Sequence, residues 1–172
     1  MDVILLSENG EPIGACPKEL VHTENTALHQ AFSCYLFNSQ GQLLITRRAL
    51  SKLTWPGVWT NSFCGHPMPG EPIEEAVRRH AAHELGARIS EPSVVLPDFA
   101  YRAVDASGIV ENERCPVFVA TLGNELAPNP DEVMDYQWVE VQNLEASVSQ
   151  TPWAFSPWVV EQLAQFSPQP AH

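Results

Sequence analysis

At 172 residues the chain is long enough for one domain with a proper core and too short for two, and its 44% hydrophobic and 17% charged composition is ordinary for a globular protein. The formal net charge of -12 argues against general nucleic-acid binding, which depends on Lys and Arg neutralising phosphates. Because no uncharged apolar run approaches the roughly 20 residues that span a bilayer and the four cysteines form no CxxC pair, we expect a reduced, cytoplasmic protein without a membrane partner.

The first part of the chain predicts strands joined by tight turns. Residues 3–6 are a short apolar strand that leads into an Asn-Gly turn, and residues 31–37 and 42–46 form a hairpin. The aromatic segment 55–60, WPGVWT, is a turn and strand that carries the chain to Asn61. The N-terminal part is therefore expected to be mostly sheet.

Basic residues gather at the exit of the predicted hairpin. Arg47, Arg48 and Lys52 are three of only nine basic residues, and they lie within six positions of an acidic protein. They fit a solvated strand end, and they equally fit an anion pocket, because Arg and Lys hold phosphate oxygens directly. Taken alone, the residues leave both interpretations open.

The stretch 61–87 joins a thiol, an imidazole, a glycine-rich turn and one helix. Pro72 suits the first helical position and Gly86 suits the position just past the end, so we predict a helix over residues 72–85. At 3.6 residues per turn, Glu84 falls on the apolar side of this helix. A buried carboxylate needs a partner, and both a metal and a salt-bridging cation would serve.

The second part of the chain again predicts strands, at 94–96, 99–104, 109–120 and 132–140. A final helix begins at Ser156-Pro157 and runs to about Phe166, and residues 167–172 form a proline-rich tail that we expect to be flexible. Strands outnumber helices, with hairpins on both sides of one major helix. This pattern favours one α+β domain over residues 1–166, with a mixed β-sheet flanked by helices.

Two pairs of ionisable residues have suggestive spacings. Glu111 and Glu113 project from the same face of a predicted strand, where like charges repel unless a cation lies between them or one carboxyl keeps its proton. Two acids on a solvated face would explain the same pattern. His22 and His29, seven residues apart, share a face only if they lie on a helix, and either ring is more often solvated or packed in a core than bound to a metal.

From Gly65 onward, the sequence resembles the Nudix box, a loop-helix-loop that binds a divalent cation for substrates carrying a diphosphate. Glu71, Arg79 and Glu84 occupy their places in the box. His80 and His83 stand where the pyrophosphohydrolases of the superfamily have glutamates. Those enzymes hold several metals with these acids, so the replacements disfavour hydrolysis.

A closer resemblance, to the type I isopentenyl-diphosphate isomerases of the Nudix superfamily, covers about residues 3–165. It implies a Nudix-like fold and an isomerase domain. Seven runs in the proper order make it highly specific. The matching runs are 22–29, 46–52, 55–62, 64–67, 108–113, 131–138 and 151–158.

This resemblance implies the interconversion of isopentenyl diphosphate and dimethylallyl diphosphate by antarafacial protonation and deprotonation through a tertiary carbocation. It implies that Cys64 and Glu113 act as acid and base on opposite faces of the alkene. The ring of Trp158 would stabilise the cation, and Tyr101 would hydrogen-bond the glutamate and help to move its proton.

The resemblance also implies two cation sites and a diphosphate pocket. Mn²⁺, Zn²⁺ or Mg²⁺ would be held by the imidazoles and carboxylates of His22, His29, His66, Glu111 and Glu113. A second cation, Mg²⁺, would arrive with the substrate and be held by Glu84, the Cys64 carbonyl and diphosphate oxygens. Lys18, Arg48 and Lys52 would contact the diphosphate.

One position departs from the pattern of the isomerases, which often carry a second arginine after the helix arginine. That arginine also reaches the diphosphate, and here His80 stands in its place, so its neutral imidazole would weaken the grip. His80→Arg is then expected to lower the apparent KM. Members of the family are often monomeric, so we expect a monomer.

Two other functions remain open. One is a Nudix hydrolase that acts on another diphosphate, and the other is a catalytically silent metal-binding module. Intact Cys64 and Glu113 argue against a silent module. Cys16, Cys34 and Cys115 are expected to be packed or weakly exposed thiols without a role.

Overall fold

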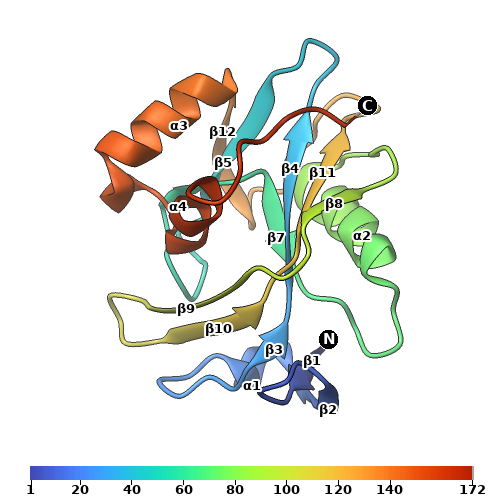
Figure 1. The fold of residues 1–172 in the computed structure, drawn as a ribbon, viewed down its shortest axis with the longest axis vertical. Helices are drawn as coiled ribbons and strands as arrows, with labels where there is room; N and C mark the ends of the chain where they lie inside the picture. The colour runs from blue at the N-terminus through green and yellow to red at the C-terminus, as the bar shows by residue number, and fades with distance from the viewer. Residues whose placement is uncertain (172) are drawn as a thin grey trace.

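The computed structural model describes residues 1–171 and contains two β-sheets, with helices on both faces of the larger one (Figure 1). The larger sheet has the strand order β12-β5-β4-β11-β8, while β6 pairs with β5 and β7 with β4. It is mixed, because β4 and β11 run parallel while the other pairs are antiparallel. Its strands are β4 (Phe32–Phe37), β5 (Leu43–Arg48), β6 (Trp59–Thr60), β7 (Phe63–Gly65), β8 (Ser93–Leu96), β11 (Val117–Thr121) and β12 (Val133–Val139).

The smaller sheet has the order β2-β1-β3-β10-β9. Its strands are β1 (Asp2–Leu6), β2 (Pro12–Pro17), β3 (His29–Gln30), β9 (Ala100–Val104) and β10 (Val110–Arg114). Strand β10 lies between β3 and β9, parallel to β3 and antiparallel to β9. The register places Glu113 opposite His29 on one side and opposite Tyr101 on the other.

Within residues 1–171, four helices and one 3-10 turn complete the fold. They are α1 (Lys18–Val21), α2 (Ile73–Leu85), α3 (Val141–Gln150), the turn at Pro152–Ala154 and α4 (Pro157–Leu163). Helix α2 ends at Gly86, whose φ of 59° is left-handed and whose N–H bonds the carbonyl of Ala82. Helix α4 begins at Ser156, whose hydroxyl accepts the Val159 N–H. Among residues 1–171, no helix has the length and apolar character needed to cross a bilayer.

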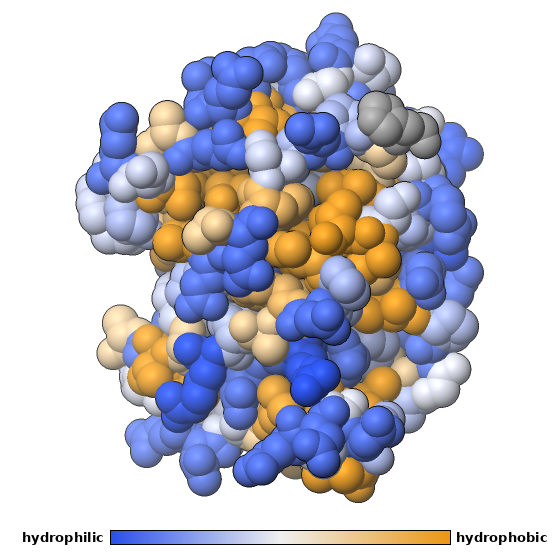
Figure 2. All heavy atoms as spheres, viewed as in Figure 1, coloured by the Kyte–Doolittle hydropathy of each residue, from blue (hydrophilic) through white to orange (hydrophobic). Residues whose placement is uncertain are grey.

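Strand β4 lies between two hydrophobic clusters, and all six of its residues are buried. Phe32 and Leu36 point to the cluster that α2 covers, whereas Tyr35 and Phe37 point to the cluster that α3 and α4 cover. Burying one such large apolar side chain contributes about 1.5–3 kcal/mol, so a strand covered on both faces is a major source of stability. Apolar side chains also gather across the middle of one face, which is hollowed between α3 and the β9–β10 hairpin (Figure 2).

The predicted fold class, a mixed sheet flanked by helices, is confirmed, but several boundaries were wrong. The single strand predicted over 109–120 is two strands in different sheets, because the chain crosses between the sheets at Cys115 and Pro116, and a proline cannot donate to a ladder. Helix α3 was missed. Only Leu144 and Val148 of this helix are buried, so its apolar stripe is too narrow to give a clear period.

The ends of the other helices differ less. The short helix α1 was not predicted, α2 begins one residue later than expected, with Pro72 as its N-cap, and α4 ends at Leu163. Residues 167–171 follow the domain surface, with Pro168 buried and the Ser167 hydroxyl bonded to Glu145. The flexibility expected of this tail stays a prediction, and His172 lies outside the described residues.

The helix end at Gly86 gives a test of the fold. A Cβ added at Gly86 would lie 2.9 Å from the Ala127 carbonyl oxygen, and the left-handed φ strains any other residue. We expect Gly86→Ala to lower the free energy of unfolding by about 1–3 kcal/mol in a urea titration. Gly14→Ala is the control, since nothing lies within 4 Å of its added Cβ. Equal stabilities of the two variants would contradict the expectation.

Candidate functional site

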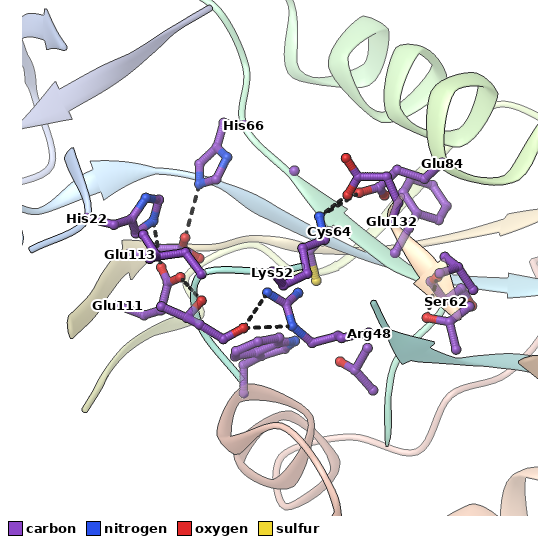
Figure 3. Close-up of a pocket in the computed structure, with 18 of the residues that line it drawn as sticks. His22, Arg48, Lys52, Ser62, Cys64, His66, Glu84, Glu111, Glu113 and Glu132 are labelled. Atoms are coloured by element: carbon purple, nitrogen blue, oxygen red, sulfur yellow. Dashed lines mark hydrogen bonds and ion pairs between the residues drawn. The ribbon is translucent and has the colours of Figure 1, made fainter. Parts of the chain in front are cut away.

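A cavity of about 150 Å³ is lined by residues of both sheets and of α2 and α4 (Figure 3). All but one of the residues that the family resemblance assigns to the site line it. They are Lys18, His22, Arg48, Lys52, Cys64, His66, Glu84, Tyr101, Glu111, Glu113 and Trp158. The exception, His29, is fully buried against Glu113. The cavity has two ends, one with imidazoles and carboxylates and one with Lys52 between Glu84 and Glu132 (Figure 3).

Three histidines and one glutamate form a compact cluster at the first end. The ligand atoms of His22, His29, His66 and Glu113 all lie within 4.8 Å of one another. His22 ends α1, His29 opens β3 and His66 follows β7, so three separate segments supply the imidazoles. The predicted grouping of the three histidines with Glu113 is therefore present in the fold.

Glu113 is held by hydrogen-bonding groups on both sides of its carboxylate. Its Oε2 accepts from the Tyr101 hydroxyl at 3.0 Å, and its Oε1 lies 3.1 Å from Nε2 of His66 and 3.3 Å from Nε2 of His29. Burial alone would raise the pKa of this carboxyl, but the neighbouring imidazoles of His29 and His66 outweigh it and hold that pKa well below its ordinary value. Glu113 is therefore a carboxylate at neutral pH.

The histidines fit a divalent metal ion. His29 Nδ1 lies 2.9 Å from the Ala27 carbonyl and donates to it, which leaves the lone pair on Nε2. That Nε2 and Nδ1 of His66 are buried atoms without a hydrogen-bond partner in the part of the chain that the structure describes. Burial also lowers the pKa of His66 to about 4, so this ring is neutral, as a metal ligand must be. Nitrogen ligands with a carboxylate suit Mn²⁺ or Zn²⁺.

Glu111 adjoins the cluster but is not one of the four grouped residues. Its Oε2 lies 3.0 Å from Nε2 of His22, and its Oε1 accepts from the Thr54 hydroxyl at 2.8 Å. Burial, together with the charge of Glu113, raises the pKa of this carboxyl. The role of Glu111 as a fifth ligand stays a prediction. Thr54 was not expected at the site, because a lone hydroxyl in a loop carries no sequence signal.

At the other end of the cavity, one ammonium lies between two carboxylates. Lys52 forms an ion pair with Glu132, and its Nζ is 4.0 Å from Oε1 of Glu84. Burial raises the pKa of Glu84 to about 7 and lowers that of Lys52 to about 8. The prediction that Glu84 lies on the inner side of its helix is confirmed, since its side chain is only 12% exposed. The sequence did not mark Glu132 as a site residue, because an acid just before a strand is common and has no motif around it.

Arg48 holds the loop that follows β5. Its Nε and Nη2 donate to the Thr54 carbonyl at 3.2 and 2.9 Å, its Nε also donates to the Trp55 carbonyl at 3.1 Å, and the guanidinium carbon lies 5.2 Å from the Trp158 ring centre. Trp55 has a φ of 42°, unusual for a residue other than glycine, and its N–H donates to the Asp105 carboxylate. Part of the guanidinium is thus engaged in fixing the cavity wall.

The thiol of Cys64 lies on β7, in register with Ser33 of β4. Its Sγ is 3.3 Å from the Ser33 hydroxyl, which also lies 3.4 Å from the Cys115 sulfur. Burial raises the pKa of Cys64 to about 12, so the thiol keeps its proton at neutral pH. Cys115 and Cys34 are buried, as expected of packed thiols.

Helix α2 supports the site through its arginine. Arg79 forms two hydrogen bonds with the Glu71 carboxylate, each at 2.8 Å, and its Nη2 donates to the His66 carbonyl at 3.0 Å. The Met68 N–H also donates to Glu71. These box residues therefore fix the backbone on the C-terminal side of His66.

The expectation that His80 faces a diphosphate is wrong. The residue is 5% exposed, and its ring lies against Gly65 and Phe32 and does not line the cavity. The His66 N–H donates to Nε2 of His80, and burial lowers the pKa of His80 to about 3. His80→Arg would bury a guanidinium here, so the predicted decrease in KM loses its basis.

Comparisons with known proteins identify the family and the fold of the chain. The NUDIX domain family matches residues 27–159. An isopentenyl-diphosphate Delta-isomerase of Clavibacter michiganensis is 57% identical over 98% of the chain and 87% of its own length, and one of Escherichia coli is 57% identical over 94% and 89%. Among solved structures, a Deinococcus radiodurans protein has a TM-score of 0.70 at 24% identity over 96% of this chain and 98% of its own. A MutT NUDIX hydrolase of Burkholderia pseudomallei has a TM-score of 0.61 at 21% identity, over 80% of this chain and 97% of its own. At these identities, both similarities show the fold alone.

The histidine cluster predicts that metal binding stabilises the fold. Adding Mn²⁺ or Zn²⁺ to metal-free protein is expected to raise the thermal midpoint, because a metal at 100 times its Kd contributes about 2.7 kcal/mol. His29→Gln removes a buried Nε2 and should lose most of this shift. His83→Gln is the control, since His83 is 60% exposed and lies outside the cluster. A full shift in His29→Gln would rule out the cluster as the metal site.

The close contact of Gly65 with His80 predicts coupling between them. A Cβ at Gly65 would lie 2.5 Å from the His80 ring, so Gly65→Ala should lower the free energy of unfolding by about 1–3 kcal/mol and weaken metal binding by moving His66. In the Gly65→Ala/His80→Ala double variant the smaller side chain makes room, and we expect a coupling energy of about 1 kcal/mol or more.

Gly14→Ala is the matched control for this cycle, because Gly14, like Gly65, lies outside the left-handed φ range and nothing lies within 4 Å of its added Cβ. Its effect should simply add to that of His80→Ala. Additivity in the Gly65 cycle as well would show that the ring does not limit this position. Chemical denaturation measures all of the variants.

Proposed function

The chain belongs to the Nudix family and, within it, to the isopentenyl-diphosphate Delta-isomerases, and from this premise we propose that it interconverts isopentenyl diphosphate and dimethylallyl diphosphate. The observation that carries the proposal is the cavity itself. One cavity brings a thiol, a carboxylate and an indole ring together with three basic side chains, those of Lys18, Arg48 and Lys52. This combination suits an isomerase for a short alkene with a diphosphate tail.

The reaction moves a double bond by one carbon, so one proton is added to the alkene and another is removed from its opposite side. We assign these transfers to Cys64 and Glu113. The two groups line one cavity but come from different sheets, Cys64 from β7 of the larger and Glu113 from β10 of the smaller. This origin supports an approach from two sides of a substrate, as antarafacial transfer requires.

The protonation states of the two groups suit the start of the reaction. Burial keeps the proton on Cys64, and the neighbouring histidines keep Glu113 ionised. The thiol would deliver its proton to the terminal carbon, and the carboxylate would take one from the carbon next to the diphosphate-bearing carbon. Each turnover leaves a thiolate and a protonated carboxyl, which return to their starting states by proton exchange with water. The Tyr101 hydroxyl, bonded to Glu113, would take part in that exchange.

Aromatic rings would stabilise the tertiary carbocation between the two transfers. Trp158 is 3% exposed and lines the cavity, with Trp55 and Tyr101 at ring distances of 5.6 and 5.7 Å. A π-face attracts a cation but offers no lone pair for covalent attack. The buried rings would also keep water, which would trap the cation as an alcohol, away from it.

The basic side chains of the cavity would hold the diphosphate. Lys18, Arg48 and Lys52 line the cavity, although the chain carries a net charge of -12. We propose that Glu84, with the Cys64 carbonyl, holds a substrate-linked Mg²⁺, which would supply positive charge to the diphosphate oxygens. Mn²⁺, Zn²⁺ or Mg²⁺ would occupy the cluster of His22, His29, His66, Glu111 and Glu113. We further propose a cytoplasmic monomer whose partner is this small-molecule substrate, without nucleic-acid or membrane partners.

The second candidate, hydrolysis of another diphosphate, has less support. Of the positions at which the hydrolases carry glutamates, only Glu84 lines the cavity as an acid, while His80 is buried beneath Gly65 and His83 is exposed. A silent metal-binding module would not require a thiol and a carboxylate at one cavity. Both alternatives differ from the isomerase in their products.

The decisive experiment is incubation of metal-loaded protein with isopentenyl diphosphate in heavy water. We expect dimethylallyl diphosphate, deuterium in both isomers and no free phosphate or pyrophosphate. Cys64→Ala and Glu113→Gln each remove one transfer group and should lower kcat by about 10³-fold or more. Release of pyrophosphate would favour the hydrolase, and an unchanged substrate with intact metal binding would favour the silent module.

A further inference from the structure

Asn61 is a buried polar residue between β6 and β7 that the proposed mechanism does not use. Its residue is 0% exposed, and its amide is fully hydrogen-bonded. A buried amide with every donor and acceptor satisfied takes a single orientation, because any rotation would leave a polar atom unpaired.

The amide nitrogen of Asn61 ties the backbone. Its Nδ2 donates to the carbonyl of Cys34 at 3.0 Å and to the carbonyl of Phe63 at 2.9 Å. Both hydrogens are used on oxygens that can only accept. The amide oxygen is therefore fixed on the other side, where only hydrogen-bond donors can satisfy it.

The amide oxygen of Asn61 meets two groups that the mechanism uses, the thiol of Cys64 and the indole of Trp158. Oδ1 accepts from Sγ of Cys64 at 3.2 Å, from Nε1 of Trp158 at 3.2 Å and from the Thr60 hydroxyl at 2.9 Å. Thr60 in turn shares a hydrogen bond of 2.8 Å with Ser156, the N-cap of the helix that carries Trp158. One oxygen atom thus joins the thiol on β7 to the indole on α4.

A second contact, with Ser33, restricts the orientation of the Cys64 thiol from another direction. The Ser33 hydroxyl lies 3.3 Å from the Cys64 sulfur and accepts from Nε2 of Gln162 at 2.9 Å, which leaves its own hydrogen free to donate to a sulfur. Since the Asn61 oxygen cannot donate, the S–H bond of Cys64 points to Asn61. The sulfur therefore sits between one donor and one acceptor, with its rotamer set by both.

We propose that Asn61 is a positioning residue, whose amide oxygen holds the Cys64 thiol and the Trp158 indole in fixed relation to each other. This inference rests on the proposed function, because it assigns a purpose to the roles of those two side chains. A misplacement of about 1 Å in a proton donor costs on the order of 100-fold in rate, so fixing both groups through one atom would protect kcat. Binding of the diphosphate end, which uses other residues, would be unaffected.

A purely structural role is the competing explanation, and Ser62 provides a matched control for it. Its hydroxyl accepts from the Leu36 N–H at 2.7 Å and donates to the Leu44 carbonyl at 2.6 Å, so it ties the same sheet from the neighbouring position. Ser62 is equally buried, but its hydroxyl bonds to neither Cys64 nor Trp158. A structural effect should therefore appear in both variants, and a positioning effect only in that of Asn61.

The experiment compares Asn61→Ala and Ser62→Ala with wild type as metal-loaded proteins, well below their thermal midpoints. Asn61→Ala is expected to lower kcat by about 100-fold with the KM for isopentenyl diphosphate within about twofold of wild type. Ser62→Ala should lose stability but keep kcat. The second readout is alkylation of Cys64 by iodoacetamide at one fixed pH, followed by peptide mass, which should become about fivefold faster in Asn61→Ala alone.

Trp158→Phe keeps an aromatic face but deletes the indole N–H, so it tests the same contact without changing Asn61. It should lower kcat about tenfold at unchanged KM, and it covers the case in which Asn61→Ala does not fold. Wild-type kcat in a folded Asn61→Ala or in Trp158→Phe, or an equal loss in Ser62→Ala, would overturn the inference. If wild type shows no turnover, the proposed function fails instead, while the alkylation rates still decide whether Asn61 orients Cys64.

Discussion

The carboxylate of Glu113 is the group on which the rest of the site depends. A buried anion is costly unless it is paired, and here a tyrosine hydroxyl and two imidazoles approach it from neighbouring strands and the segment after β7. The β3-β10-β9 register produces this arrangement directly, because it sets His29 and Tyr101 opposite Glu113. The same carboxylate faces the cavity, so one side chain serves both the metal cluster and the proposed proton transfer.

Much of the site could be predicted, since its residues belong to motifs with fixed spacing. The sequence placed Glu111 and Glu113 on one strand face and Glu84 on the inner side of a helix, and the structure agrees. It could not bring His22 and His29 to one point, because that depends on strand pairings across distant segments. The family resemblance supplied this link. The mixed sheet and the major helix followed from local patterns, whereas α3, with two buried side chains, left too weak a signal.

The residues that were missed share a physical reason. Ser33, Thr54, Asn61 and Glu132 each contact a group far away in the chain, which for Asn61 is the indole of Trp158, and none has a local pattern that marks it. His80 shows the opposite failure. Its place in a motif suggested contact with the substrate, but Gly65 leaves room for its ring beneath the backbone of the loop. In both cases the tertiary packing, not the periodicity, decides the role of the side chain.

The parallel pairing of β3 with β10 also has a consequence for how the protein matures. It joins His29 to Glu113 across a long stretch of chain, and such distant contacts form late because closing the intervening loop costs entropy. The cluster that could hold an ion therefore does not exist in any short fragment, because it needs the chain from His22 to Glu113. A bound ion would stabilise only a chain in which this pairing is complete, and it would shift the folding equilibrium toward that state by mass action.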